Sequence, residues 1–533
     1  MNRRDFVHIG LAGGAVAAAS KAQAGAGRGP RHAEPRADLM QLQADMAAGK
    51  QSAVALVAMY LARIRALDRA GPRLNAIIEL NPEAPAIAAA LDAERKARGA
   101  RGPLHGIPLL LKDNIATADK MRTSAGSLAL AHGPAARDAH IVTRLRSAGA
   151  VILGKTNLSE WANLRSPRST SGWSARGGLT RNPYALDRNT SGSSSGTGAA
   201  IAASLAAIGV GTETDGSIVS PASICGLVGI KPSLGLVSRS GIIPLAHTQD
   251  TAGPMTRSVS DAALLLQALA GPDPQDPITL DRAAAIPDYS QALDRNGLRG
   301  ARIGVARNFF GNNDELDAII ETALKDLVAQ GAVLVDPVEV PNITKFQDSE
   351  LEVLLFEFKA NLPKYLAEYA PGAPIADMAS LIAFNLKHAG RELPFFGQEF
   401  LQRAQAKGAL DTEAYRTALA TNQRYSQAEG LDQVLKEHRL DALVAPTGGP
   451  AWLTDFINGD HSGNGFSSPA AVAGYPHVTV PAGLLHGLPV GLSFVGPAFS
   501  EAALIKYAFA YEQASGRRRA PTYPASVSRR ASS

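Results

Sequence analysis

The chain has 533 residues, 45% of them hydrophobic and 19% charged, so it can bury a large core as an ordinary soluble globular protein. Its net charge of +5 is spread without a long basic run, which argues against nucleic-acid binding. One cysteine, Cys225, excludes an internal disulfide and lies in an apolar run that predicts a small buried side chain. The sequence shows no HExxH or paired CxxC pattern, so neither a metal nor another cofactor is expected.

The N-terminus resembles an export signal. Arg3 and Arg4 precede Phe6, a short weakly apolar stretch follows, and AQA at 22–24 has the form of a cleavage site. The stretch is too short and too rich in Gly and Ala to span a bilayer of ~30 Å. We therefore expect a twin-arginine signal peptide over 1–24 and a mature domain over 25–533 that is periplasmic or secreted, with no stable membrane association.

The first elements expected in the mature domain are helices. Apolar residues recur at helical spacing between about 37 and 68, and a further helix is predicted over 84–98, so 37–98 should form a helical arm. A buried strand from Ile107 to Leu111 then ends at Lys112. Lysine is rarely buried unless it is paired or functional, and the alternative is a side chain whose amine reaches solvent.

Strands and helices alternate through most of the remaining chain. Strands are expected over 150–157, 226–231, 301–307, 332–340, 440–447, 477–483 and 489–496, and helices over 139–148, 199–207, 315–330 and 500–513. This alternation predicts an α/β fold, a single large domain with a central mixed, mostly parallel sheet covered by helices on both faces. Residues 345–440 read as mostly helical and are expected to be a helical insertion near the site.

Two clusters of serine and glycine, GSSSG at 192–196 and TETDGSIVSP at 212–221, indicate where that site lies. Such clusters let backbone N–H groups approach a ligand closely. One interpretation of GSSSG is the G-x-S-x-G nucleophile elbow, with Ser194 as nucleophile and His477 or His486 as base. An elbow needs a buried strand before the serine, whereas the polar, turn-like NPYALDRNT precedes it here.

A second interpretation uses both clusters together with Lys112. The segments GIPLLLKDNI (106–115), LGKTNLSEWAN (153–163), GSSSG and GTETDGSIVSPASICGLVGIKPS (211–233) resemble the amidase signature family in sequence and in order. A softer likeness, in TSAGSLAL (123–130), SGWSARGG (171–178) and AAVAGYP (470–476), is to its bacterial peptide amidases. The resemblance covers nearly the whole mature chain, places the signature core at 99–260 and implies hydrolysis of the C-terminal amide of peptides.

The resemblance also implies the site residues. The family's catalytic lysine falls on Lys112, its bridging serine, which follows a cis peptide bond, on Ser193, and its nucleophile on Ser217. Backbone N–H groups of Thr214, Asp215, Gly216 and Ser217 would form the oxyanion hole; Asp215 stands where many members have glycine. Burial would lower the pKa of Lys112 from its ordinary ~10.4, so that the neutral amine can accept a proton through Ser193. The implied reaction passes through an acyl-enzyme and releases ammonia.

Three alternatives remain open. The chain could act on aryl or fatty amides or esters. It could be the glutamine-amidase subunit of a tRNA-dependent amidotransferase, which works in the cytoplasm with a partner chain, although the export signal argues against this. It could also be a non-catalytic exported binding protein, which the intact lysine and serines disfavour. The main expectation is a small-molecule or peptide amide substrate, with no nucleic acid and no obligatory protein partner.

Overall fold

The computed structural model describes residues 38–282, 286–463 and 465–527. The expected signal peptide at 1–24 lies outside these residues. Within them, no helix combines the length and the apolar character that crossing a membrane requires.

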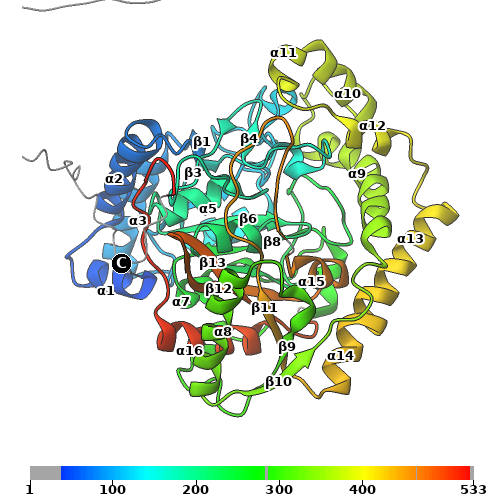
Figure 1. Ribbon diagram of the computed structural model, residues 1–533. Coiled ribbons are helices and arrows are strands. Elements are labelled where there is room, and N and C mark those ends of the chain that lie inside the picture. Colours follow the sequence, from blue (N-terminus) through cyan, green and yellow to red (C-terminus); the bar gives the residue numbers. More distant parts are fainter. Residues whose placement is uncertain (1–37, 283–285, 464, 528–533) are drawn as a thin grey trace, which may run out of the picture. The chain divides into compact units, whose positions relative to one another are not determined.

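An 11-stranded sheet forms the centre of the described fold (Figure 1). Its spatial order is β1-β3-β2-β6-β8-β7-β12-β13-β11-β9-β10. The strands are β1 (Ile77–Leu80), β2 (Pro108–Lys112), β3 (Val151–Thr156), β6 (Ile208–Glu213), β7 (Val228–Lys231), β8 (Thr251–Thr256), β9 (Arg302–Ala306), β10 (Val333–Val338), β11 (Ala442–Pro446), β12 (His477–Leu485) and β13 (Leu488–Val495). Two short strands, β4 (Trp173–Ser174) and β5 (Gly178–Leu179), pair separately.

The sheet is mixed, which confirms the α/β class expected from the sequence. Parallel pairs join β3, β2 and β6 at one end and β11, β9 and β10 at the other. Between these groups the neighbours run antiparallel, so antiparallel pairing takes a larger share than simple alternation predicts. Part of the reason is the β12–β13 hairpin, which turns at His486 and Gly487 with φ of 50° and 87°, a backbone that a tight two-residue turn requires.

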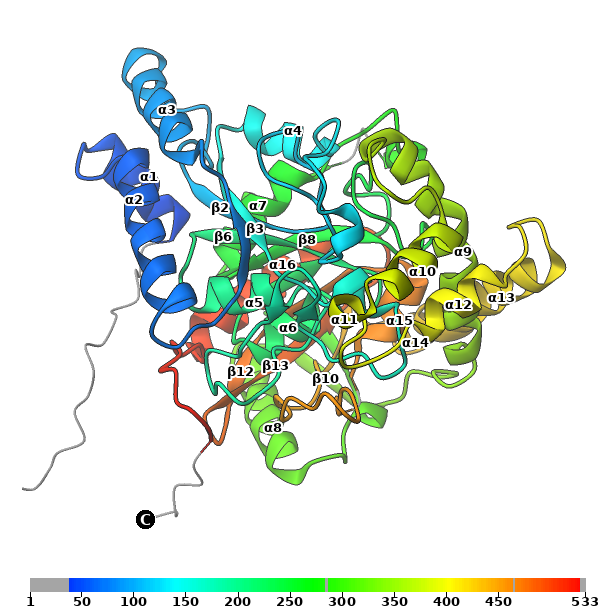
Figure 2. The same cartoon turned by 90° about the horizontal axis from the view of Figure 1, so that it is seen from above.

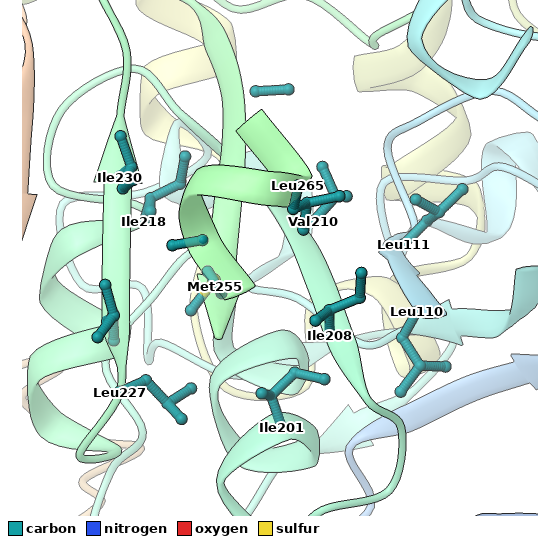
Figure 3. Close-up of a cluster of buried hydrophobic side chains, with 14 of the residues drawn as sticks. Leu110, Leu111, Ile201, Ile208, Val210, Ile218, Leu227, Ile230, Met255 and Leu265 are labelled. Carbon is teal, nitrogen blue, oxygen red and sulfur yellow. The ribbon is translucent and has the colours of Figure 1, made fainter. Parts of the chain in front are cut away.

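Helices cover both faces of the sheet. One face carries α5 (Ser195–Ala202) and α6 (Val219–Ile224), and the other carries α7 (Val259–Leu269), α8 (Asp314–Ala329) and α16 (Glu501–Ser515). Close approach on the first face depends on glycine: a Cβ on Gly209 or Gly229 would lie 2.7 Å from Thr197 of α5 or Ala222 of α6. Figure 3 shows the buried apolar side chains that these strands and helices contribute. The predicted burial of Cys225 is observed.

Two helical segments lie on opposite sides of the sheet in both views (Figures 1 and 2). The N-terminal one contains α1 (Leu39–Ala47), α2 (Ala53–Arg63), a π-helical turn (Ile64–Arg69) and α3 (Ala84–Arg98). The other contains α9 (Gln347–Tyr369), α10 (Met378–Lys387), α11 (Ala389–Glu392), α12 (Glu399–Gln405), α13 (Glu413–Gln423), a π-helical stretch (Arg424–Leu431) and α14 (Asp432–Glu437). The remaining helices are α4 (His140–Ser147), α15 (Ser467–Ala473) and the 3-10 turns Leu128–Leu130, Glu160–Asn163, Pro277–Arg282, Tyr289–Ala292 and Arg307–Phe309.

The second helical segment is joined to the core by a buried arginine. Arg165 forms an ion pair with Glu160, and both side chains are fully buried. The same guanidinium donates hydrogen bonds to the backbone carbonyls of Glu392, Phe396 and Gly397. Because these carbonyls follow α10, the arginine ties residues 392–397 to the part of the core that precedes the first serine cluster.

Candidate active site

The predicted site residues meet where two neighbouring strands end. Because β2 and β6 are parallel neighbours, their carboxyl ends lie at the same edge of the sheet. Lys112 is the last residue of β2, and the loop that follows β6 carries Ser217. Ser193 lies just before α5, which packs against β2 and β6. The fold therefore brings together residues from both serine clusters and the lysine.

The Lys112 amine is fully buried and fully engaged in hydrogen bonds. Nζ donates to Ser193 Oγ at 2.7 Å, to Thr212 Oγ1 at 2.9 Å and to the Thr212 carbonyl at 3.1 Å. Burial lowers the pKa of Lys112 to about 7, although the nearby Glu213 and Asp250 carboxylates act in the opposite direction. The amine therefore changes charge near neutral pH, where an ordinary lysine stays protonated.

A second hydrogen bond extends the chain to Ser217. Ser193 Oγ donates to Ser217 Oγ at 3.0 Å, so a continuous path runs from the lysine amine through one hydroxyl to another. Ser193 is 0% exposed, whereas Ser217 keeps 7% of its surface accessible. Of the two serines on the path, Ser217 is thus the more accessible.

The loop between β6 and α6 is held from both ends. Glu213 Oε2 accepts the N–H groups of Ile218 and Val219 at 2.7 and 3.0 Å, and Ser194 N–H donates to the Ser217 carbonyl at 3.2 Å. Gly216 has a φ of +73°, which glycine adopts without steric cost. These constraints fix the backbone on both sides of Ser217.

That fixed backbone presents free donors. The N–H groups of Thr214, Asp215, Gly216 and Ser217 donate no hydrogen bond to any acceptor in the described parts of the chain. Four consecutive unpaired N–H groups beside a hydroxyl form an arrangement that suits an anionic oxygen. These N–H groups of the predicted oxyanion loop are therefore not used within the described fold.

The peptide bond between Gly192 and Ser193 is cis. Space at this position is restricted, since a Cβ on Gly192 would overlap Ser159 Oγ and approach Ser171 Oγ to 2.9 Å. No residue larger than glycine fits at position 192. The next residue, Ser193, lies between Lys112 and Ser217.

The elbow interpretation of Ser194 finds no support. Its hydroxyl is buried and bonded to the backbone of Thr212, donating to the carbonyl at 3.0 Å and accepting the N–H at 3.2 Å. His477 is buried beside Ser493, 2.5 Å from its hydroxyl, and burial lowers the pKa of this histidine to about 3. His486 is a hairpin residue paired with Glu315. Neither histidine contacts Ser194, so its hydroxyl supports the fold.

Two further buried lysines show what distinguishes Lys112. Lys155 Nζ donates to the Ile115 carbonyl and to Thr123 Oγ1, each at 2.7 Å, and Lys231 Nζ donates to the Pro232 carbonyl at 3.1 Å. Burial lowers the pKa of each of them to about 8. Of the three, Lys112 is the one whose amine contacts a serine hydroxyl that leads to a second serine.

Sequence reasoning missed three residues that build this site. Thr212 accepts from Lys112, Asn114 Nδ2 donates to Thr212 Oγ1 at 2.9 Å, and Glu213 holds the loop. The available signal was their place in the motifs: Thr212 and Glu213 belong to the cluster 212–221, and Asn114 follows Lys112 in the segment 106–115. Across the described residues, no group of three or more His, Cys, Asp or Glu side chains could hold a metal ion.

Comparison with known proteins assigns the family. The amidase family model matches residues 55–505. A probable amidase of Arabidopsis thaliana is 42% identical over 88% of this chain and 88% of its own. A glutamyl-tRNA(Gln) amidotransferase subunit of Pseudomonas syringae is 34% identical over 89% of this chain and 96% of its own.

A solved structure agrees with these relatives. The native peptide amidase of Stenotrophomonas maltophilia superposes with a TM-score of 0.86 and 53% identity, over 91% of this chain and 98% of that one. The chain is therefore a member of the amidase signature family and an amide hydrolase.

Proposed function

We propose that Ser217 is the nucleophile, Ser193 the proton carrier and Lys112 the base of this amide hydrolase. The observation that carries the proposal is the unbroken hydrogen-bond path from Lys112 Nζ through Ser193 Oγ to Ser217 Oγ, with steps of 2.7 and 3.0 Å. A serine hydroxyl needs a base to become a good nucleophile, and a lysine whose pKa lies near 7 supplies one at neutral pH.

The reaction follows from this path. Ser217 Oγ attacks the carboxamide carbon while its proton passes to Ser193 Oγ, and the proton of Ser193 passes to the neutral Lys112 amine. Collapse of the tetrahedral intermediate returns a proton along the same path to the leaving nitrogen, and ammonia departs. Water then attacks the acyl-enzyme and gives up a proton along the same path toward Lys112. The proton returns to Ser217 Oγ as the ester bond breaks, and the carboxylic acid is released.

The loop 214–217 stabilises the intermediate in this proposal. Its free N–H groups receive the oxyanion, and each such donor typically contributes about 3 kcal/mol of transition-state stabilisation. Since these donors belong to a backbone fixed by Glu213 and Gly216, they need no rearrangement when the charge develops.

We further propose that the preferred substrate is the C-terminal amide of a peptide. The proposal is supported by 53% identity, over nearly the whole length, to a protein described as a peptide amidase. The helical segment 347–437 lies beside the core, and in this proposal an extended peptide binds along it. If the binding groove closes just beyond the terminal amide, internal peptide bonds should survive.

Two measurements test these roles. Labelling with a fluorophosphonate, followed by peptide mapping, should place the adduct on Ser217, and Ser217→Ala should leave only background ammonia release. An adduct on Ser194 would overturn the assignment.

A substrate panel tests the specificity. The isolated chain is supplied with amidated peptides, aryl amides, fatty amides and esters, and ammonia and fragments are measured. Fastest release from amidated peptides without internal cleavage is expected. Endopeptidase fragments, or a preference for fatty amides, would contradict the proposal.

A second candidate is glutamine hydrolysis within a tRNA-dependent amidotransferase, favoured by 34% identity to one chain of such an enzyme over 96% of its length. That role requires a partner chain. Ammonia release from amidated peptides by the isolated chain, with glutamine as a poor substrate, would separate the two. We propose that this enzyme acts without an obligatory partner.

We also propose export to the periplasm by the twin-arginine route, on the basis of Arg3, Arg4 and the AQA at 22–24. Fusing residues 1–24 to a reporter that is active only after export tests this. Replacing both arginines by lysine should retain the reporter in the cytoplasm. Equal export of the two fusions would exclude the twin-arginine route.

A further inference from the structure

The loop that carries the proposed oxyanion hole also carries a carboxylate. Asp215 Oδ2 accepts a hydrogen bond from Ser468 Oγ of α15 at 2.5 Å. Its other oxygen, Oδ1, is buried and has no hydrogen-bond donor among the described residues. A buried carboxylate oxygen without a donor is costly, so a nearby group that can supply a proton is expected.

Glu350 of α9 is that group. Gln249 Nε2 donates to Glu350 Oε1 at 2.9 Å and to the Thr214 carbonyl at 3.3 Å, which places Glu350 beside the loop. The Glu350 carboxyl lies in hydrogen-bonding contact with Asp215. Burial and the charge of Asp215 together raise the pKa of Glu350 well above its usual range.

Two carboxylates in contact cannot both be ionised without strong repulsion, so the pair holds one proton. If that proton resides on Glu350, its O–H donates to the orphaned Oδ1 of Asp215, and every oxygen of the loop carboxylate is then satisfied. In that state Asp215 has donors on two sides: Ser468 of α15 and Glu350 of α9.

We propose that Glu350 is a positioning residue, whose protonated carboxyl braces Asp215 and thereby holds the N–H groups of 214–217 in place for the oxyanion. This inference rests on the proposed roles of Ser217 and its loop. It assigns the helical segment 347–437 a part in the chemistry, because α9 contributes the brace.

The charge around the pair determines what happens when the proton is lost. On the sheet side, the charges of Glu213 and Lys231 interact with the charge of Asp215. Glu350 faces Asp215 from α9. The hydrogen-bond partners Gln249 and Ser468 are neutral. Deprotonation puts a second negative charge beside the oxyanion loop and removes its hydrogen bond. The rate constant kcat should therefore fall at alkaline pH, with KM changed much less, because the ground-state amide carries no charge.

Variants of Glu350 separate the brace from general packing. In Glu350→Gln the amide N–H can still donate to Asp215 at every pH, so kcat should stay close to wild type and its alkaline decline should disappear. In Glu350→Ala the donor is lost, and kcat should fall about tenfold or more at all pH values. Glu352→Gln is the matched control, since this neighbour on α9 pairs with Lys407 and should behave as wild type.

The outcomes are decisive in both directions. Activity of Glu350→Gln as low as that of Glu350→Ala, or an alkaline decline that persists in Glu350→Gln, would overturn the brace. The absence of any alkaline decline in the wild type would also overturn it. Fluorophosphonate labelling of each preparation keeps the two proposals distinct: wild-type protein that is not labelled at Ser217 contradicts the nucleophile, whereas normal labelling with a failed Glu350 result contradicts the brace alone.

Discussion

The Lys112 amine lies 2.7 Å from the Ser193 hydroxyl, although 81 positions separate the two residues in the sequence. The contact exists because β2 ends at Lys112 while Ser193 stands at the start of α5, which packs against the same strand. Both side chains are 0% exposed, so the proton path between them excludes solvent. Removal of water is what makes the charge state of the lysine depend on its surroundings.

This burial predicts the acid limb of the pH profile. The pKa of Lys112 is lowered to about 7, so the amine is protonated below that pH and neutral above it. Since the neutral form is the base, kcat/KM should rise with pH through about 7, before the alkaline decline expected from Glu350. Lys112→Ala should remove this rise with pH. It should also lower kcat/KM by about 10²–10⁴-fold or more, since general-base catalysis usually contributes that much. Stopped assays of ammonia release across pH measure both effects.

Lys112→Arg sharpens the test. A guanidinium stays protonated at every working pH, so the arginine variant should be nearly as inactive as the alanine variant. The control is Lys155→Arg, which makes the same substitution at another buried lysine, whose amine contacts no serine. A folded Lys112→Ala protein that keeps activity within about tenfold of wild type, with an unchanged acid limb, would contradict the proposed base.

Much of the fold was predictable because its strands are apolar and its helices periodic. The strand at β2 and the pair β12 and β13 are found within two residues of their expected ends. The missed strands β6 and β8 read IGVGTE and TAGPMT, and their glycines, proline and polar residues hide the strand pattern. Gly209 and Gly253 are there because neighbouring atoms leave no room for a side chain, which is a tertiary reason that a local pattern does not carry.

The candidate site, like the fold, was only partly predictable from the sequence. Lys112 could be singled out because a lysine at the end of an apolar strand is unusual, and Ser193 and Ser217 followed from the family motifs. Thr212 lies in the second cluster, but its contact with Lys112 across two strands could not be predicted, and Glu350 comes from a helix far along the chain. Contacts of this kind depend on packing between elements that the sequence alone does not place.

Thr212 should tune the base without being essential. Its hydroxyl accepts a hydrogen bond from the Lys112 amine, and such a bond favours the charged form. Thr212→Val keeps the shape but removes the acceptor, so the pKa of Lys112 should fall and the acid limb of kcat/KM should move to lower pH. The same pH series measures the shift. Movement of the limb to higher pH would show that Thr212 does not act on the charged amine.

Gly216 should be intolerant of a side chain for two reasons. Its φ of +73° disfavours any other residue, and a Cβ would lie 3.0 Å from Ser467 Oγ. Gly216→Ala should displace the N–H groups of the loop and lower kcat by about 10²-fold, since displacements near 1 Å have effects of that size. Gly300→Ala is the matched control, because Gly300 has a φ of +76° with open space around its Cβ. Similar activity losses in both variants would mean that general instability, rather than the loop, is responsible.

Arg165 should hold the second helical segment against the core. Its guanidinium is fully buried, pairs with Glu160 and donates to carbonyls of Glu392, Phe396 and Gly397. Arg165→Met keeps the apolar length of the side chain but leaves the carboxylate and the carbonyls without their donor. Removal of one partner from a buried ion pair typically costs about 3–5 kcal/mol in the free energy of unfolding. Urea unfolding should therefore show a clearly lower midpoint.

A nearby arginine gives the control for this change. Arg168 forms an ion pair with Glu399, but its side chain is 63% exposed, so Arg168→Met should shift the midpoint little. Limited proteolysis adds a local readout, because loss of the Arg165 hydrogen bonds should expose residues 392–397 to cleavage before the rest of the domain. If the Arg165→Met protein unfolds at the wild-type midpoint and residues 392–397 remain protected, packing of the helices alone holds the segment in place, and the buried ion pair contributes no net stability.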